Sequence, residues 1–170
     1  MSYLGIDTSN YTTSLSLVRD GRVVCNLKKS VYVAEHQRGV RQSDALLPLL
    51  MEELGATNDL EAIGYSARPR DVEGSYMPCF LGGELVARTL AANRGLPLYA
   101  FSHQAGHVRA ALYSAGATHL IGKRFLAFHV SGGTTELLLC EGDQITLVGG
   151  TEDLTAGQAI DRIGVKMGLS

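Results

Sequence analysis

The sequence predicts an α/β fold built of two units of unequal size. Two observations predict this fold. The chain opens with three short strand-like segments and then alternates helix-like with strand-like segments. At Phe125 the three-strand opening begins again, and one more helix-like segment follows it. Helices and strands in such an order pack as layers around a mixed sheet.

The first three strands are expected to form a meander. Strands are predicted over Tyr3–Asp7 and Thr12–Val18, the second with alternating Leu and Ser. Asp20 and Gly21 are a hairpin-turn signal, and a third strand is expected over Arg22–Lys28. The chain therefore begins with three consecutive strands joined by short turns.

Helices and strands alternate in the next part of the chain. Residues 31–41 show no clear period and are expected to form a loop. Apolar spacing then predicts a helix over Ser43–Leu54, with Ser43 as its cap and Gly55 as its stop. Pro48 lies inside this helix, so we expect a kink or a later start. The elements expected next are the strand Ala62–Ser66, the helix Phe80–Asn93, the strand Pro97–Ala100 and the helix His103–Ser114.

This order of elements is that of a ribonuclease-H-like domain, a mixed sheet with helices on both faces. The second unit restarts the pattern, with strands over Phe125–Ser131, Thr135–Cys140 and Gln144–Val148 and a helix over Asp153–Leu169. We therefore expect one complete lobe over residues 1–120 and the beginning of a second over residues 121–170. A truncated second lobe is favoured over a degenerate one.

Composition and charge narrow the class of protein. The chain has 170 residues, 45% of them hydrophobic and 19% charged, which is an ordinary globular balance. The net charge of −2 argues against a nucleic-acid binder that acts alone, although a local patch or a partner could still contact RNA. Cys25, Cys79 and Cys140 have no metal or redox spacing, which favours free thiols in a reducing cytoplasm. No leader or membrane-spanning run is expected.

The chain contains two similar hairpins, LGIDTSNYTTSLSLV and HVSGGTTELLL. A turn rich in Gly, Ser and Thr presents backbone N–H groups on a concave edge, where they can bind phosphate oxygens. Two such hairpins, one in each lobe, can hold the polyphosphate of a nucleotide, as in the actin-like ATPase (ASKHA) superfamily. The other interpretation is that both are ordinary turns.

Two carboxylates are candidates for this nucleotide site. Asp7 ends the first strand, where it could hold a hydrated divalent cation or cap its own turn. Asp161 shares a predicted helix face with Asp153 and Gly157, and it could contact ribose or a phosphate-bound metal or simply be solvated. Gly157 removes side-chain bulk where another group could approach closely.

The segment FSHQAGH places His103 and His107 four residues apart. On a helix this spacing puts both imidazoles on one face, within reach of one metal ion, although two unrelated helical histidines remain an alternative. A metal site needs a third ligand, and no spacing singles one out among His36, Asp71 and His119, which we expect at the surface. Because position 104 is glutamine, the motif of a zinc protease is absent.

The chain resembles the TsaD family of tRNA-modifying proteins, formerly described as O-sialoglycoprotein endopeptidases. Matching segments run through the chain in the family's order: LGIDTSNYTTSLSLV, GYSARP at residues 64–69, SHQAGHVRAAL at residues 102–112, HVSGGTTELL, and DLTAGQAIDRIGVKMGL. They cover only the first half of a family member. The resemblance implies the two-lobe actin-like fold and the transfer of a threonylcarbamoyl group from threonylcarbamoyl-AMP to N6 of adenosine 37 in tRNAs that read ANN codons.

The resemblance also implies ligands, site residues and partners. One iron or zinc ion would lie on His103 and His107 and on a carboxylate beyond this chain. Asp7, singled out above by its place at the end of the first strand, is the candidate catalytic residue. The nucleotide would be threonylcarbamoyl-AMP, or ATP or ADP with magnesium. The implied partners are tRNA, a TsaB-like paralogue and an ATPase subunit. The residues implied to contact the nucleotide are Val130, Ser131, Gly132, Gly133, Gly157 and Asp161.

Several positions depart from the family pattern. Arg68-Pro69-Arg70 stands where the family has Gly-Pro-Gly, and the two arginines could contact phosphate or be solvated. Thr134, Gln158 and Ala105 replace a histidine and two acidic residues. Two alternatives therefore stay open: a non-catalytic paralogue that acts as a dimerisation scaffold, and a kinase or ATPase of the actin-like superfamily. From the 170-residue chain alone we expect little or no transfer.

Overall fold

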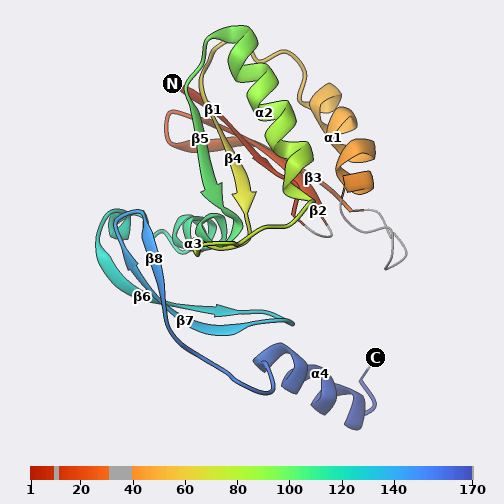
Figure 1. Cartoon of the computed structure of the whole chain (residues 1–170), viewed down its shortest axis with the longest axis vertical. Helices are drawn as coiled ribbons and strands as arrows, with labels where there is room; N and C mark the ends of the chain where they lie inside the picture. The colour runs from red at the N-terminus through yellow and green to blue at the C-terminus, as the bar shows by residue number, and fades with distance from the viewer. Residues whose placement is uncertain (10–11, 31–39, 170) are drawn as a thin grey trace. The chain divides into compact units, whose positions relative to one another are not determined.

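The computed structural model describes residues 1–9, 12–30 and 40–169, and for residues 40–45 it describes the helix without the side chains. The chain divides into two compact units, Met1–Gly106 and His107–Ser170 (Figure 1). This division lies inside a helix, earlier in the chain than the predicted lobe boundary at residue 120. Most of the predicted loop over 31–41, together with His36, lies outside the described residues.

The first unit contains a five-stranded sheet. Its strands are β1 (Ser2–Asp7), β2 (Thr12–Arg19), β3 (Arg22–Ser30), β4 (Leu60–Arg68) and β5 (Leu98–Ser102), in the spatial order β3-β2-β1-β4-β5. The first three strands pair antiparallel, whereas β4 pairs parallel with both β1 and β5. The sheet is therefore mixed, as predicted, and the parallel-paired strands β1, β4 and β5 end at the same edge.

The turn between β2 and β3 confirms the hairpin signal. Asp20 and Gly21 have φ values of 49° and 75°. A two-residue hairpin of this type needs positive φ at both central residues, which aspartate tolerates and glycine favours. The predicted strands on both sides of the turn are confirmed, and the structure extends each of them at its carboxyl end, to Arg19 and to Ser30.

Two helices cover one face of this sheet, α1 (Val40–Leu54) and α2 (Phe80–Arg94) (Figure 1). Their apolar side chains pack against alternate residues of β1, β2 and β4. The opposite face carries exposed aromatic side chains, including Tyr99 and Phe101. The buried cluster consists of Leu4, Ile6, Leu15, Leu17, Leu47, Leu50, Leu60, Ile63, Tyr65, Ala87 and Ala91.

Helix α1 corrects one prediction and confirms another. It begins at Val40, so Ser43 lies inside the helix and is not its cap, and Pro48 does not delay its start. Leu47 and Leu50 are 2% and 0% exposed, and their burial stabilises the helix in spite of the proline. Gly55 ends the helix as predicted, with a φ of 72° and its N–H donating to the Met51 carbonyl.

The remaining elements of this part of the chain lie close to their predicted bounds. Helix α2 ends at Arg94, and the following Gly95 adopts the left-handed conformation. Strand β4 is longer than predicted at both ends, and β5 begins at Leu98, one residue after Pro97. Helix α3 (His103–Ser114) has the predicted bounds.

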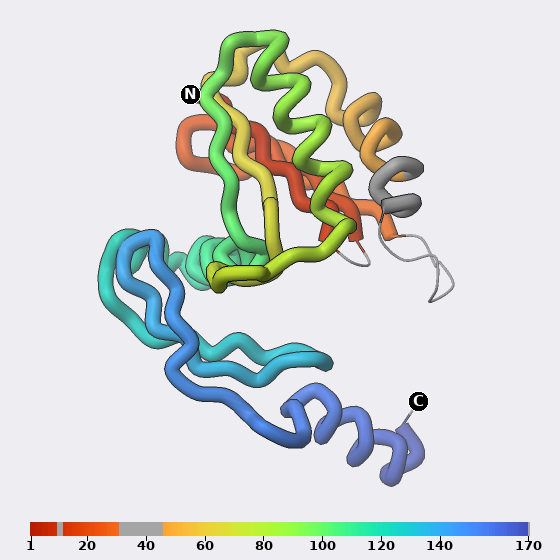
Figure 2. Tube along the Cα trace, in the orientation of Figure 1, coloured from red at the N-terminus to blue at the C-terminus, as the bar shows by residue number. Residues whose placement is uncertain are grey.

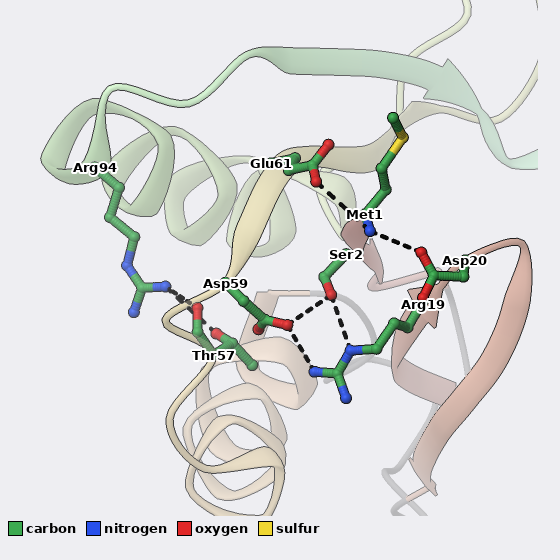
Figure 3. Close-up of polar contacts among 8 residues, drawn as sticks. All are labelled: Met1, Ser2, Arg19, Asp20, Thr57, Asp59, Glu61 and Arg94. Carbon is green, nitrogen blue, oxygen red and sulfur yellow. Dashed lines mark hydrogen bonds and ion pairs between the residues drawn. The ribbon is translucent and has the colours of Figure 1, made fainter.

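A polar network joins the starts of β1 and β4 to the end of β2 (Figure 3). The Ser2 hydroxyl donates to the Asp59 carboxylate at 2.8 Å, and Arg19 contacts Ser2 at 3.0 Å and Asp59 at 2.8 Å. Nearby, the Arg94 guanidinium donates to the carbonyl of Thr57. These contacts fasten the amino ends of the two central strands.

The second unit holds a three-stranded antiparallel sheet of β6 (Arg124–Val130), β7 (Thr135–Glu141) and β8 (Gln144–Gly150), in that spatial order. Figure 2 follows the same meander along the Cα trace. All three strands were predicted, and β6 ends at Val130, so that Ser131 opens the turn to β7.

Helix α4 (Ala156–Lys166) is shorter than the predicted 153–169. Thr155 caps it: its hydroxyl accepts the N–H of Gln158, and the Gln158 side chain accepts the N–H of Thr155, both at 3.3 Å. Asp153 therefore lies before the helix and shares no helix face with Asp161. Among the described residues, no helix combines the length and the apolar character needed to cross a membrane.

Candidate functional site

Polar side chains gather where the three parallel strands of the first unit end. Asp7 is the last residue of β1, Ser66 lies near the end of β4, and His103 follows β5 directly. The carboxyl ends of parallel strands share one edge of a sheet, which is where ligands bind in many α/β proteins. The register of the sheet thus brings together residues that are far apart in the sequence.

The Asp7 carboxylate is the centre of this cluster. Its Oδ2 lies 2.8 Å from Nδ1 of His103 and accepts the Ser66 hydroxyl at 2.5 Å. Its Oδ1 accepts the backbone N–H of Ser9 at 2.8 Å. The contact with Ser9 is that of an aspartate capping its own turn, one of the two roles that the sequence left open. Both oxygens of Asp7 are therefore engaged within the protein.

The surroundings of Asp7 favour its charged form. Burial alone would raise the pKa of this carboxyl group. Hydrogen bonds from His103, Ser66 and Ser9, together with the charge on a protonated His103, have the opposite effect and exceed it. The net result holds the pKa of Asp7 below its ordinary range, so the carboxylate is ionised at neutral pH.

His103 is the first residue of α3, and His107 follows one turn later on the same helix. Nδ1 of His103 is bonded to Asp7, and the Phe80 ring centroid lies 6.2 Å from that of His103. In the second unit, the His107 ring lies 5.6 Å from the ring of His129.

Whether His103 and His107 could bind a metal ion depends on the orientation of their ring nitrogens and on a third ligand nearby. A histidine whose Nδ1–H is held by a carboxylate presents the lone pair of Nε2, which is the usual arrangement of a metal-binding histidine. Within residues 1–9, 12–30 and 40–169, no group of three or more His, Cys, Asp or Glu side chains is placed to hold a metal. In the described part of the chain His103 has this arrangement, and no complete ligand set is present.

The other predicted ligands lie elsewhere. Asp71 is bound to Arg68 and Ser102, with contacts of 2.6 Å and 2.7 Å. His119 lies on a short 3-10 helix over Thr118–Leu120 and is exposed. Both are thus separate from the Asp7 cluster in the contacts they make.

In the turn after β6, a side-chain hydroxyl binds backbone N–H groups of the same turn. The Ser131 hydroxyl accepts the N–H groups of Gly133 and Thr134 at 3.2 Å and 3.0 Å. It also lies 2.7 Å from the Thr134 hydroxyl. Two of the N–H groups that were expected to face a phosphate are therefore satisfied within the turn, and Val130 precedes it at the end of β6 with 52% of its surface exposed.

Gly157 fits against this turn. A Cβ added to Gly157 would lie 2.6 Å from the Ser131 carbonyl oxygen and 2.7 Å from Cα of Gly132. The Thr155 hydroxyl donates to the Gly132 carbonyl at 2.9 Å. The close approach that the sequence predicted at Gly157 is made by the chain's own backbone. Asp161 lies one helical turn further along α4 and is exposed.

Three residues of the strand-end region were missed by sequence reasoning: Ser66, Asp71 as a hydrogen-bond acceptor, and Ser102. Each had a usable signal, because Ser66 and Ser102 are polar residues at the end of an apolar strand and Asp71 follows the arginine that it binds by three residues. Residues at the carboxyl ends of parallel strands could have been grouped by that rule.

The fold and this site define a class of protein. The chain is similar to YeaZ from Pseudomonas aeruginosa, with a TM-score of 0.54 and 19% identity over 91% of this chain and 67% of that chain. It is also similar to the ROK hexokinase from Thermus thermophilus, with a TM-score of 0.52 and 19% identity over 93% of this chain and 51% of that chain. The chain has the actin-like ATPase fold, which confirms the predicted fold class.

Sequence comparison narrows the class to one family. Residues 37–170 match TsaD, described as tRNA N6-adenosine threonylcarbamoyltransferase. Relatives of that name are 36% identical in Thermus thermophilus (99% of this chain, 53% of the relative) and 29% identical in Pyrobaculum islandicum (99% of this chain, 51% of the relative). The chain belongs to the TsaD family of transferases. It spans about half the length of the curated relatives that it matches.

Proposed function

We propose that this chain forms the metal-binding half of an enzyme that transfers a threonylcarbamoyl group from threonylcarbamoyl-AMP to N6 of adenosine 37 in ANN-decoding tRNA. Membership of the TsaD family supports the reaction class. The observation that supports the site is the 2.8 Å contact between Asp7 and Nδ1 of His103. This contact gives His103 the orientation that a metal ligand needs.

Each residue has a distinct part in this proposal. Asp7 holds the proton on Nδ1 of His103, so that the lone pair of Nε2 is directed away from Asp7. His103 and His107 would hold one iron or zinc ion, which when bound polarises an oxygen of the activated substrate as a Lewis acid. Both oxygens of Asp7 already have partners. We therefore propose that Asp7 orients His103 and does not bind magnesium.

The nucleotide is assigned to the second hairpin. We propose that the backbone from Val130 to Gly133 lies along the AMP moiety and that Asp161 contacts its ribose or phosphate. Gly157 contributes by letting α4 approach the turn closely. For a phosphate to use the N–H groups of Gly133 and Thr134, the Ser131 hydroxyl must rotate away from them.

We further propose that the enzyme acts in the cytoplasm with a TsaB-like paralogue and an ATPase subunit. The net charge of −2 is consistent with tRNA being held largely by such partners. A second function, that of a non-catalytic dimerisation scaffold, is favoured by one observation: the N–H groups of Gly133 and Thr134 already donate to the Ser131 hydroxyl.

A transfer assay distinguishes these two functions. The full protein, its partner subunits, threonylcarbamoyl-AMP and an ANN-decoding tRNA would be incubated, and modified adenosine would be quantified by mass spectrometry. We expect transfer by the wild type and by His119→Ala, and loss of transfer in His103→Ala. No transfer by any of the three would leave the scaffold function in place of the enzyme.

A further inference from the structure

The loop after β4 is joined to the start of α3 by a chain of charged and polar groups. The Arg68 guanidinium lies 2.6 Å from Oδ1 of Asp71, and Oδ2 of Asp71 accepts the Ser102 hydroxyl at 2.7 Å. The Ser102 hydroxyl in turn accepts the N–H of Ala105 at 3.1 Å. Ser102 is 1% exposed, so its hydroxyl lies inside the protein, whereas the Arg68 and Asp71 side chains are partly exposed.

Each step of this chain has a physical reason. The first N–H groups of a helix have no partner within the helix, and a serine before the helix commonly supplies one. A serine hydroxyl that donates to a carboxylate keeps its lone pairs free to accept. Asp71 therefore fixes the rotation of the Ser102 hydroxyl so that it caps α3, and Arg68 holds Asp71 in place.

A backbone contact acts in parallel with the side chains. The N–H of Gln104 donates to the Pro69 carbonyl at 3.0 Å. One N–H group in the first turn of α3 is thus bound directly by the segment that contains Arg68, Pro69 and Asp71. A second is bound by the Ser102 hydroxyl, which Asp71 of that segment holds. His103, the first residue of that turn, is held between this segment and Asp7.

We propose that Arg68, Asp71 and Ser102 are positioning residues that fix the first turn of α3 and, through it, the direction of the His103 ring. The predicted effect on metal binding rests on the proposed function of His103, whereas the predicted effect on the first turn of α3 does not. Arg68 acts through Asp71 in this proposal and does not bind phosphate.

The same unit contains a matched control. Ser2, Arg19 and Asp59 form a network of the same three residue types at the opposite ends of the strands (Figure 3). None of these three residues contacts α3 in the interactions above. Replacing Asp59 with alanine thus removes a comparable carboxylate without disturbing the start of α3.

The experiment compares Asp71→Ala with Asp59→Ala in the full chain. The first two readouts need no metal: hydrogen exchange at the Ala105 amide, and the NMR resonance of the His103 Nδ1 proton that bonds to Asp7. The third is the affinity for Zn²⁺ alone, measured by competition with a coloured chelator. Arg68→Gln and Arg68→Lys are measured in the same way, because lysine keeps the positive charge beside Asp71.

We expect Asp71→Ala to speed exchange at Ala105 several-fold, to broaden the His103 resonance and to weaken Zn²⁺ binding roughly 10-fold. Arg68→Gln should change the three readouts in the same direction, whereas Arg68→Lys should keep them close to the wild-type values. Asp59→Ala should leave all three readouts unchanged. Unchanged exchange and resonance in Asp71→Ala would overturn the proposal. A wild type that binds no Zn²⁺ would count against the proposed function alone, because exchange and resonance still judge the positioning role.

Discussion

At the scale of a single residue, Asp7 shows how a strand end of the sheet orients a histidine side chain. A carboxylate at the end of β1 meets a hydroxyl from β4 and an imidazole from α3, and each of them donates to it. A charged carboxylate in a partly buried position costs free energy unless such donors are present. The donors that compensate for its burial also fix the ring of His103.

The stability of the first unit should depend on the charge of Asp7. The pKa of Asp7 in the folded state is below its unfolded value, which is about 3.9. The contribution of Asp7 is therefore complete above the unfolded pKa and is lost as the pH falls toward the folded pKa. Asp7→Asn should flatten the decline of the unfolding free energy below about pH 4, measured by urea denaturation at a series of pH values.

The control for this prediction is Asp143→Asn, because the Asp143 side chain is 93% exposed and its pair with Arg109 should contribute little. This variant should follow the wild-type curve. If Asp7→Asn declined in parallel with the wild type, the donors around Asp7 would not stabilise its charged form.

Gly157 gives a second prediction at this scale. A methyl group there would lie 2.6 Å from the Ser131 carbonyl oxygen, and the backbone would have to move, at a cost of about 1–3 kcal/mol. Gly157→Ala should therefore lower the thermal stability of the second unit. Gly164→Ala, on the same helix with open space around it, should raise stability by roughly 0.5–1 kcal/mol. Equal effects from both substitutions would contradict the close approach.

At the scale of elements, the second hairpin and α4 form one connected structure. Thr155 caps the helix and also donates to the Gly132 carbonyl, while the N–H of Ala156 donates to the Thr135 hydroxyl at 2.8 Å. The turn and the first turn of the helix therefore share their hydrogen bonds. This explains why Gln158 is compatible with the fold, since its side chain completes the cap from the position of the family's acidic residue.

Removing the cap should loosen both elements. Thr155→Ala should cost about 1–2 kcal/mol, because the helix loses its cap and the Gly132 carbonyl loses a donor. Hydrogen exchange of the Gln158 amide and of the turn after β6 should speed up together. Thr155→Ser keeps the hydroxyl and should remain close to the wild type, whereas faster exchange confined to α4 would show that the two elements are independent.

Elements were more predictable from the sequence than the contacts between them. The strands and α3 follow from apolar periodicity and turn residues, which act locally. The bounds of α1 and α4 were missed because burial of Leu47 and Leu50 outweighed Pro48, and because Thr155 proved a stronger start than Asp153. The pairing of Asp7 with Ser66 and His103 depends on strand order and register, which a single sequence does not specify.

At the scale of the whole molecule, the chain is a TsaD-family protein with an actin-like fold that spans about half the length of its curated relatives. Its described residues hold no group of three His, Cys, Asp or Glu side chains placed to bind a metal. We therefore expect the 170-residue chain by itself to transfer little or no threonylcarbamoyl group in the assay above. Robust transfer by this chain alone would show that two histidines suffice.

Metal content tests most directly our proposal that α3 carries a metal centre. The full protein would be purified without added metal, and elemental analysis would compare the wild type, the His103→Ala/His107→Ala double variant and His119→Ala. The account predicts near-stoichiometric iron or zinc in the wild type and in His119→Ala, and its loss in the double variant. No metal in the wild type, or equal metal in all three, would contradict it.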